Sequence, residues 1–348
     1  MRVVLITRFY RNGQTTHVLT LCAELKRQGH QVFLIISRLD CPNYASWLQT
    51  NAIPYSTHGD PLRLVEFLKK WQPDLIHNHS GHTLQASIAL GEILQIPTLT
   101  TTHYLDFEPK ELLAQQAAVV VISGEMQKLF RLSVPTFAIE NGIALPPEPK
   151  PRQFTQQALF LAHVSAKKEE NFVKMASSLL AWGWKVESAG NWRNPGVKYL
   201  GWVNNIWPLL ERADLVIGTG RTIREGMSAG CATWVLGEYS DGLVTPGNVQ
   251  ALRKTNFSGR TQKKPFDQKK AGLLQDPNDD LFRNLGLFGR RYACKNFAIE
   301  NVVQKLSQIY AYILKDHHGQ GSKTGKSRIV SNIAGKGGIV NETGDHCS

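Results

Sequence analysis

The stretch Ala213-Asp-Leu-Val-Ile-Gly-Thr-Gly-Arg-Thr-Ile-Arg-Glu-Gly-Met-Ser-Ala-Gly230 joins three structural signals in a row. It predicts a buried strand over 214–217, a glycine turn over 218–220, and a helix that begins at Arg221. A strand that enters a helix through glycines directs backbone N–H groups and the positive end of the helix dipole at one point, which suits a phosphate. Glu225, about one turn inside the helix, is placed to accept hydrogen bonds from sugar hydroxyls. The stretch indicates a phosphorylated ligand such as a nucleotide sugar.

Strands and helices alternate on both sides of this stretch. Before residue 145, apolar runs predict strands at 2–7, 31–37, 75–77, 98–102 and 118–122, with helices at 17–28, 62–71 and 83–94. After residue 152, the same reasoning predicts strands at 158–162, 185–189, 197–200 and 234–237, with helices at 171–182, 206–211, 284–295 and 300–314. Alternation at this spacing favours parallel sheets covered by helices on both faces. The expected fold class is α/β, with two doubly wound, Rossmann-like domains.

A proline run, Pro146-Pro-Glu-Pro-Lys-Pro151, interrupts the alternation. Such a run fits neither a helix nor a central strand, so it marks a linker. We expect an N-terminal domain over 1–145, the linker over 146–152 and a C-terminal domain over 153–315. The remaining residues, 316–348, are rich in glycine, serine, lysine and asparagine and are expected to be disordered. Two doubly wound domains joined in this way bind ligands in the cleft between them.

The chain is strongly basic, with a net charge of +12 and an isoelectric point near 9.5. Nucleic acid, an anionic membrane surface and anionic substrates all attract a basic protein. No helix-turn-helix, zinc-finger or RNA-binding signature accompanies the charge, so we expect no nucleic-acid partner. Anionic lipid or phosphate ligands are the better explanation, and plain solvation of surface lysines is the alternative.

The chain also carries no sign of secretion or membrane insertion. Its longest apolar runs are too short to span a bilayer, and its first residues form an apolar segment too short for a signal peptide. Five scattered cysteines, never spaced as C-x-x-C, argue for free thiols in a reducing compartment. A cytoplasmic location is therefore expected, with peripheral contact at the inner membrane face as a possibility.

Polar residues follow the strands of the first domain. Gly13 opens a helix after the first strand, where it suits either an ordinary turn or a diphosphate contact. His77 and His79 follow a strand, with His82 three residues on; metal ligation is conceivable, but no carboxylate or cysteine completes the set, so we expect them to line a polar cleft. His103 closes the strand at 98–102, at a position for a catalytic or sugar-binding group.

In the second domain, His163 to Lys168 follow a strand. Lys167 or Lys168 is placed to stabilise a leaving diphosphate, although either also suits a solvated surface. Asp241-Gly242 and Thr245-Pro-Gly-Asn248 form loops after the strand at 234–237 and are expected to border the same phosphate site.

With these residues in view, the chain from Met1 to about Leu314 resembles a family 4 glycosyltransferase of the GT-B fold. The pieces that carry the resemblance occur in the family's order. They are the Gly13 loop, Gly29-His-Gln-Val32, Pro73-Asp-Leu-Ile-His-Asn-His79, Thr101-Thr-His103, Val121-Ile-Ser123, Glu140-Asn-Gly-Ile143, Phe160 to Lys168, Tyr199-Leu-Gly-Trp202, Ala213-Asp214 and Glu225-Gly-Met-Ser-Ala-Gly230.

The resemblance implies transfer of a sugar from a nucleotide-diphosphate donor with retention of configuration, without a metal or other cofactor. By resemblance, Glu225 holds the donor ribose as the second glutamate of the family's E-x7-E motif. Lys168 matches the basic residue at the diphosphate. His103 matches the N-domain histidine near the transferred sugar, and Gly13 approaches the diphosphate.

Two departures from the family pattern stand out. Ile217 occupies the position of the motif's first glutamate, and His163 replaces the arginine expected before Lys168. We expect the backbone of the glycine-rich turn to bind the phosphates in their place, helped by one side chain. The residues assigned to this role are Gly218, Thr219, Gly220, Arg221 and Thr222.

The sequence thus predicts an enzyme, a hexosyltransferase with a glycan, lipid-linked or small-molecule acceptor. Its expected partners are the nucleotide-sugar donor, that acceptor and an anionic membrane surface. A nucleotide-sugar epimerase on the same fold and a catalytically silent nucleotide-sugar-binding protein are the alternatives that Ile217 leaves open.

Overall fold

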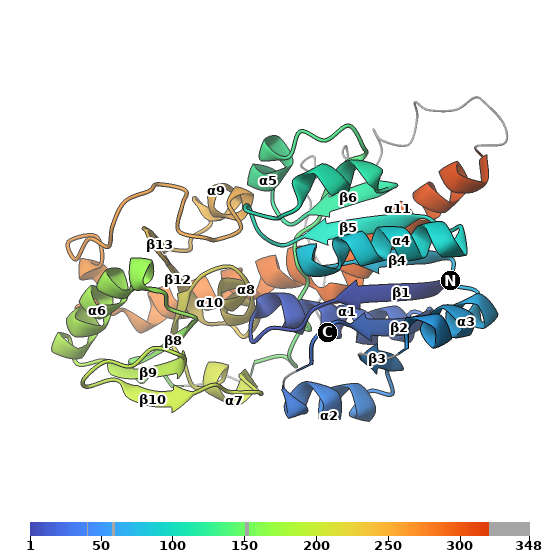
Figure 1. Ribbon diagram of the computed structural model, residues 1–348. Helices are drawn as coiled ribbons and strands as arrows, with labels where there is room; N and C mark the ends of the chain where they lie inside the picture. The colour runs from blue at the N-terminus through green and yellow to red at the C-terminus, as the bar shows by residue number, and fades with distance from the viewer. Residues whose placement is uncertain (40, 58–59, 150–152, 320–348) are drawn as a thin grey trace.

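The computed structural model describes residues 1–39, 41–57, 60–149 and 153–319. These residues form two α/β halves, each built on its own sheet (Figure 1). The mixed α/β fold class with two Rossmann-like domains is as predicted from the alternating pattern.

The N-terminal sheet has seven parallel strands in the order β3-β2-β1-β4-β5-β6-β7. Its strands are β1 (Arg2–Thr7), β2 (Gln31–Ile36), β3 (Tyr55–Thr57), β4 (Leu75–Asn78), β5 (Thr98–Thr102), β6 (Ala118–Val121) and β7 (Thr136–Ala138). Between them run α1 (Gly13–Arg27), α2 (Pro42–Thr50), α3 (Pro61–Trp71), η1 (Gly81–Thr83), α4 (Leu84–Leu94), η2 (Lys110–Gln115) and α5 (Gly124–Leu129). The strand order reverses between β1 and β4, which is where such sheets bind ligands.

The C-terminal sheet has the order β10-β9-β8-β11-β12-β13, with only β13 antiparallel to its neighbour. Its strands are β8 (Gln157–Ala162), β9 (Lys185–Gly190), β10 (Lys198–Gly201), β11 (Leu215–Gly218), β12 (Ala232–Leu236) and β13 (Ser240–Leu243). The helices are α6 (Ala166–Ala181), α7 (Trp207–Leu210), α8 (Arg221–Ser228), α9 (Val249–Lys254), η3 (Gly272–Leu274) and α10 (Asp279–Phe297). Helix α8 begins at Arg221, as predicted, while β11 lies one residue later than expected.

The last helix, α11 (Ile299–Gly319), returns to the N-terminal half (Figure 1). Its apolar residues Val303, Leu306 and Ile309 are buried in one core with β1, α1 and β2. Residues up to 315 were expected in the C-terminal domain, but α11 packs against the N-terminal sheet, so the C-terminal domain ends before this helix. The amphipathic pattern of a helix predicts that the helix has a buried face, but it does not predict which sheet that face covers.

The expected linker and the expected disordered tail lie only partly within the residues that the structure describes. Residues 144–149 contain no helix or strand, while 150–152 of the expected linker lie outside the described residues. Helix α11 extends to Gly319, so the first residues of the expected disordered tail are helical, and 320–348 lie outside the described residues.

Two further findings concern the thiols and the helices. Cys22, Cys41, Cys231 and Cys294 are buried and form no disulfide within the described part of the chain, and Cys347 lies outside it. Within the described ranges, every helix is too short or too polar to cross a membrane.

Candidate functional site

The carboxyl ends of the two sheets meet where α1 and α8 begin. Gly13 is the first residue of α1, and a Cβ built on it would lie 3.6 Å from the Cβ of Arg221, the first residue of α8. The structure therefore brings these two predicted donor-site residues together across the domain boundary. Any side chain at position 13 would occupy the space between the two helix starts.

Arg221 and Glu225 form an ion pair one helical turn apart on α8. The Arg221 Nε donates to Glu225 Oε1 at 2.6 Å, and the two side chains are only 13% and 9% exposed. Arg221 Nη1 also donates to the carbonyl of Gly142 in the first domain, at 2.9 Å. Burial raises the pKa of Glu225, while Arg221 and Arg224 act in the opposite direction. Arg221 and Glu225 thus form a largely buried ion pair at the boundary between the domains.

The glycine turn before α8 is tightly built. A Cβ on Gly218 would lie 2.7 Å from the carbonyl oxygen of Leu161 at the end of β8, so only glycine fits there. Gly220 has φ of 60° and caps α8 in a conformation that favours glycine. The Thr222 hydroxyl donates to Leu161 O at 2.7 Å, so this side chain ties α8 to β8. The Thr222 hydroxyl proton is therefore engaged, and the Thr222 backbone N–H donates to Thr219 O at 3.2 Å.

Lys168 lies near the same edge, in the first turn of α6. Its Nζ donates to the carbonyl of His163 at 3.1 Å and its side chain is half-buried. Desolvation lowers the pKa of Lys168, and Glu238 acts to raise it. The ammonium is thus held beside the end of β8, whereas Lys167 is exposed.

The loop after α9, residues 255–262, supports the glycine turn from the far side and was not identified from the sequence. Phe257 O accepts a hydrogen bond from Gly220 N at 2.9 Å, and Asn256 accepts one from the guanidinium of Arg224. Arg224 is fully buried, with its guanidinium 4.9 Å from the centre of the Phe297 ring. The turn-forming residues Asn256 and Gly259 are a signal for a loop, but the positive φ of 51° at Phe257 has no signal in the sequence.

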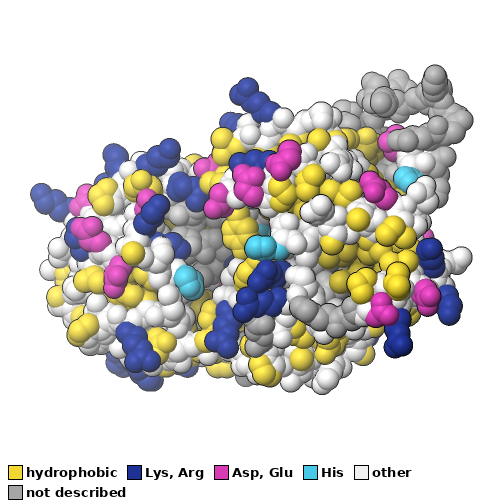
Figure 2. All heavy atoms as spheres, in the orientation of Figure 1, with side chains coloured by type: hydrophobic (Ala, Val, Ile, Leu, Met, Phe, Trp, Pro, Cys, Tyr) yellow, Lys and Arg dark blue, Asp and Glu magenta, His cyan; other side chains and the backbone are white. Residues whose placement is uncertain are grey.

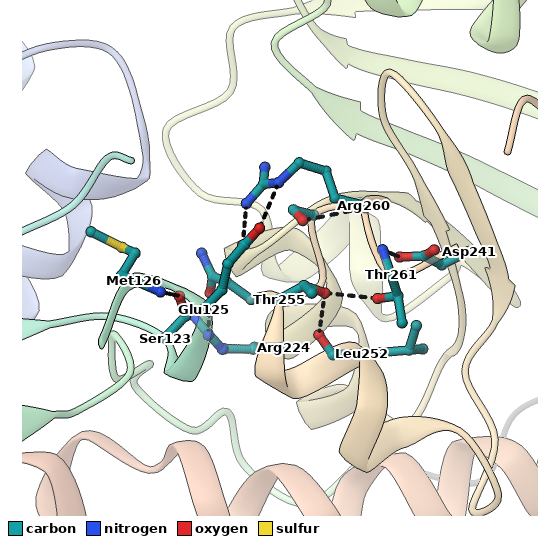
Figure 3. A network of polar contacts seen from close by, with 11 residues as sticks. Ser123, Glu125, Met126, Arg224, Asp241, Leu252, Thr255, Arg260 and Thr261 are labelled. Carbon is teal, nitrogen blue, oxygen red and sulfur yellow. Dashed lines mark hydrogen bonds and ion pairs between the residues drawn. The ribbon is translucent and has the colours of Figure 1, made fainter. Parts of the chain in front are cut away.

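Figure 3 shows how this loop reaches the N-terminal half. Arg260 Nη2 contacts the carboxylate of Glu125 at 2.7 Å, and Glu125 lies in the first turn of α5. On the other side, Asp241 accepts backbone hydrogen bonds from Thr261 and Gln262 at 3.1 and 2.8 Å. Asp241 was expected to border the phosphate site, and its carboxylate in fact holds the loop in place.

Four buried histidines lie together at the carboxyl ends of β4 and β5. The ring of His79 stacks on that of His103 with centroids 5.4 Å apart, and His79 Nδ1 is 3.2 Å from His103 Nε2. His17 of α1, which was not singled out from the sequence, lies 5.7 Å from His103 between ring centroids. Burial lowers the pKa of His103 to about 3 and that of His17 and His79 well below the usual value, so the cluster is neutral.

His77 differs from the other three histidines. Its side chain is fully enclosed, with Nδ1 2.7 Å from the Tyr310 hydroxyl of α11 and Nε2 2.7 Å from the Thr101 hydroxyl. It was expected to line the acceptor side of the cleft with His79, but helix α11 covers it. Within the described residues, no three histidine, cysteine or acidic side chains are placed to hold a metal ion together.

His79 lines a cavity of about 560 Å³ in the N-terminal half. The cavity lies at the ends of β1, β4 and β5. Its lining consists of Tyr10, Asn12, Gln14, His79, Ser80, Gly81, His82, Tyr104, Asp106, Phe107, Glu108 and Pro109. The volume is in the range of small-molecule sites. The predicted residue Gly13 follows Asn12 directly, so the cavity adjoins the meeting point of α1 and α8.

Comparisons with known proteins agree with this geometry. Residues 11–145 match the model of glycosyltransferase family 4. A curated relative, the alpha-monoglucosyldiacylglycerol synthase of Streptococcus pneumoniae, is 29% identical over 117 residues, which cover 30% of this chain and 26% of that protein. The match therefore spans about a quarter of the relative's length.

Solved structures extend the likeness to both halves. A glycosyltransferase from Rickettsia africae has a TM-score of 0.64 at 16% identity, covering 90% of this chain and 99% of the other. Anabaena HepE in complex with UDP-glucose has a TM-score of 0.65 at 14% identity, covering 90% and 100%. At these identities the likeness establishes the fold. The first domain matches the model of family 4 glycosyltransferases, and the two-domain likeness shows that the chain has the GT-B fold.

Proposed function

We propose that the protein is a retaining hexosyltransferase that moves a sugar from a nucleotide-diphosphate donor to a glycan, lipid-linked or small-molecule acceptor. The observation that carries this proposal is the Arg221–Glu225 pair at the glycine turn, directed at the Gly13 end of α1. It joins a phosphate-binding helix start to a buried carboxylate at the place where the two domains meet. The relative from Streptococcus pneumoniae, by its name a glycolipid synthase, supports the same class of reaction.

In this proposal each polar group at the boundary has a role. The N–H groups of Thr219 and Arg221 and the Lys168 ammonium bind the diphosphate, which approaches Gly13 closely, because the N–H groups of Gly220 and Thr222 already donate to Phe257 O and Thr219 O. Arg221 has five N–H groups and uses two of them in the contacts described, so it has donors left for a phosphate oxygen. Glu225 Oε1 is held by Arg221, which leaves Oε2 for the ribose hydroxyls. His103, the proposed catalytic residue, is neutral and therefore suits a hydrogen bond to the transferred sugar.

Ile217 is fully buried within β11 and packs in the core of the C-terminal half. It takes no part in donor binding, so the contact that the family's first glutamate makes must come from elsewhere or be absent. We propose that the backbone of the glycine turn replaces it. This substitution is also the reason to keep an epimerase or a silent binding protein as alternatives.

We further propose a cytoplasmic location with peripheral contact to an anionic membrane through α3. This helix exposes Leu62 by 74% and Phe67 by 42%, with Lys69 and Lys70 exposed beside them. Exposed apolar side chains with adjacent cations are typical of helices that lie at a membrane surface. Figure 2 shows lysine and arginine spread over the visible face with acidic groups interspersed, so the charge on this face does not form one basic field.

Donor binding is tested by thermal shift with UDP, GDP, ADP and CDP and their glucose conjugates. A ligand at 100 times its dissociation constant stabilises the folded state by about 2.7 kcal/mol, which raises the melting temperature. Glu225→Gln should lower the affinity for the nucleotide that gives a thermal shift about tenfold, because the ribose loses a charged hydrogen-bond partner. Glu169→Gln, an exposed carboxylate on α6, is the matched control and should leave the shift unchanged.

Turnover separates the alternatives. The donor that binds is incubated without acceptor, and its products are analysed by NMR. Slow release of free sugar with its original anomeric configuration supports a retaining transferase, whereas an isomerised donor supports an epimerase. No shift with any nucleotide would count against the donor-binding roles proposed for Arg221 and Glu225.

A further inference from the structure

Two unpaired polar atoms lie buried at the boundary between the halves. They are the amide oxygen of Asn141, a residue that is 8% exposed, and Nδ1 of His103, a residue that is 7% exposed. Neither atom has a hydrogen-bond partner of good geometry among the residues that the structure describes. A buried polar atom without a partner costs free energy, and native structures seldom keep one without a reason. Two of them at one place therefore indicate a role beyond packing.

The two atoms act on each other. Burial lowers the pKa of His103 to about 3, and Asn141 opposes this effect as a hydrogen-bond acceptor. An amide oxygen has such an effect only on a ring nitrogen that carries a proton. The other ring nitrogen of His103 is engaged, because Nε2 lies 3.2 Å from Nδ1 of His79. The Asn141 oxygen therefore faces Nδ1 of His103.

The neighbouring imidazole of His17 has a different acceptor. Its ring lies 5.7 Å from that of His103 between centroids, in an edge-to-face arrangement. Burial lowers the pKa of His17, and the acceptor that acts to raise this pKa is the Gly142 carbonyl rather than Asn141. His17 thus packs against the ring of His103 and leaves the Asn141 oxygen to it.

These contacts select one tautomer of His103. A neutral imidazole carries its proton on one nitrogen only. With the proton on Nδ1, His103 donates toward Asn141 and accepts from His79 through Nε2, so both contacts are attractive. With the proton on Nε2, the lone pairs of His103 Nδ1 and the Asn141 oxygen would face each other in a buried site, where an unpaired polar atom is most costly. Nε2 is therefore a hydrogen-bond acceptor.

The C-terminal half holds both neighbours of Asn141 in place. The carboxylate of Glu140 accepts from Arg253 Nε of α9 at 2.5 Å. The carbonyl of Gly142 accepts from Arg221 Nη1 at 2.9 Å. The backbone of Asn141 is thus fixed from the other half of the molecule, and one of the two anchors is the arginine proposed to bind the diphosphate.

We propose that Asn141 is a positioning residue that holds the proton of His103 on Nδ1 and thereby makes Nε2 the acceptor for a hydroxyl of the transferred sugar. This role rests on the proposed transferase function. The sugar hydroxyl takes the place of His79 as the donor to Nε2, so the contact needs no proton transfer. A donor sugar with a carboxylate in place of that hydroxyl has no proton to offer and is disfavoured.

The tautomer is measured directly by long-range proton–nitrogen NMR on the full chain with isotope-labelled histidine. Comparison with His103→Gln identifies the His103 signals among those of the 11 histidines. We expect a protonated Nδ1 and a bare Nε2 in the native protein without ligand. A protonated Nε2 would overturn the inference. Because this measurement needs no change at position 141, a folding defect cannot obscure it.

Two variants of Asn141 separate positioning from packing. Asn141→Leu keeps the approximate volume and removes the acceptor, so His103 should shift toward the tautomer with its proton on Nε2. Asn141→Asp keeps an acceptor oxygen, so it should retain the native tautomer, and its charge should raise the pKa of His103. Asn51→Leu, at a half-buried asparagine that ends α2, is the control and should leave the tautomer unchanged. An unchanged tautomer in Asn141→Leu would contradict the proposal.

Turnover gives a readout that a packing defect alone would not give. In the proposed binding mode a nucleoside diphosphate without its sugar does not contact His103, so Asn141→Leu should keep the thermal shift with that nucleotide. Release of free sugar from the corresponding nucleotide sugar should fall about tenfold through the loss of one hydrogen bond, and Asn141→Asp should recover most of it. Equal losses of nucleotide binding and of turnover would show a packing role and overturn the inference.

The same measurements distinguish this inference from the proposed function. A nucleotide shift together with a protonated Nε2 on His103 leaves the proposed function standing and removes the role of Asn141. The expected tautomer without a shift from any nucleotide removes the transferase, and with it the contact to the sugar.

Discussion

At the residue scale, the four buried imidazoles make the protein sensitive to acid. Desolvation lowers the pKa of His77 and His103 to about 3, and the pKa of His17 and His79 is lowered well below 6.5. The groups that face them include Arg221 on α8, whose positive charge opposes protonation of His17. In the unfolded chain the same imidazoles take up protons near pH 6.5.

The sign of the pH dependence follows from that difference. Above pH 6.5 both states are neutral and the histidines contribute their full stability. As the pH falls from 6.5 toward 3, only the unfolded state binds protons, so stability is lost by up to about 1.4 kcal/mol per pH unit for each imidazole. Urea unfolding measured between pH 7.5 and 4.5 should show this loss. His103→Gln should make the slope shallower by about one proton, and an unchanged slope would show that His103 is protonated in the folded state.

Residue roles could be predicted only where the partners are close in sequence. Glu225 and Arg221 lie one helical turn apart, so a glycine turn and a helix start were enough to place both in the first half of α8. The contact of Arg221 with the Gly142 carbonyl joins positions 79 residues apart and has no local signal. His77 and His79 share a strand face in the sequence pattern, yet Tyr310, which is 233 residues away, encloses only the first.

At the element scale, the loop over 255–262 connects the glycine turn before α8 to α5 of the other half. It contacts Gly220 through Phe257 and reaches Glu125 through Arg260. The strand at 234–237 was predicted from the hydrophobic pattern, but helix α9 was not, and the loop has no periodicity and was missed. Its conformation depends on tertiary contacts, above all the buried guanidinium of Arg224 between Asn256 and Phe297.

The Arg260–Glu125 pair should hold the two halves together in the absence of ligand. Its side chains are 33% and 25% exposed, so we expect at most about 1 kcal/mol, or a roughly fivefold change in the ratio of closed to open forms. Glu125→Gln should therefore increase the radius of gyration measured by small-angle X-ray scattering, and high salt should do the same to the native protein. Glu170→Gln breaks an exposed pair within α6 and serves as the control. Equal radii for both variants would mean that the pair does not restrain the domains.

At the scale of the whole molecule, the two halves are joined by a chain that crosses between them twice, once near residues 144–149 and once at α11. The alternation of strands and helices predicted both sheets, and a helix at 300–314 was expected. The half of the molecule against which this helix packs was not predicted, because an apolar stripe on a helix fits the core of either half. Periodicity alone predicted two α/β halves, whereas the resemblance to a known family predicted that they form a GT-B fold.

Helix α11 should determine the stability of the N-terminal half. Tyr310→Phe removes the hydroxyl that contacts His77 Nδ1 and leaves a buried polar atom without its partner, at a cost of about 1–3 kcal/mol. Tyr312→Phe on the same helix is a matched control, for which we expect a change within about 0.5 kcal/mol. Urea unfolding followed by tryptophan fluorescence measures both. Equal stabilities would show that the hydroxyl contact is not formed in solution.

The return of α11 also has a consequence for synthesis on the ribosome. The strands of the N-terminal sheet emerge first, but their core remains open on one side until Val303, Leu306 and Ile309 have been made. At about 5–20 residues per second, the stretch from Ile139 to Ile313 takes roughly 10–35 s to translate. During that time the nascent chain displays an apolar surface, which makes it a natural client for a chaperone and delays completion of the first domain until the second has been translated.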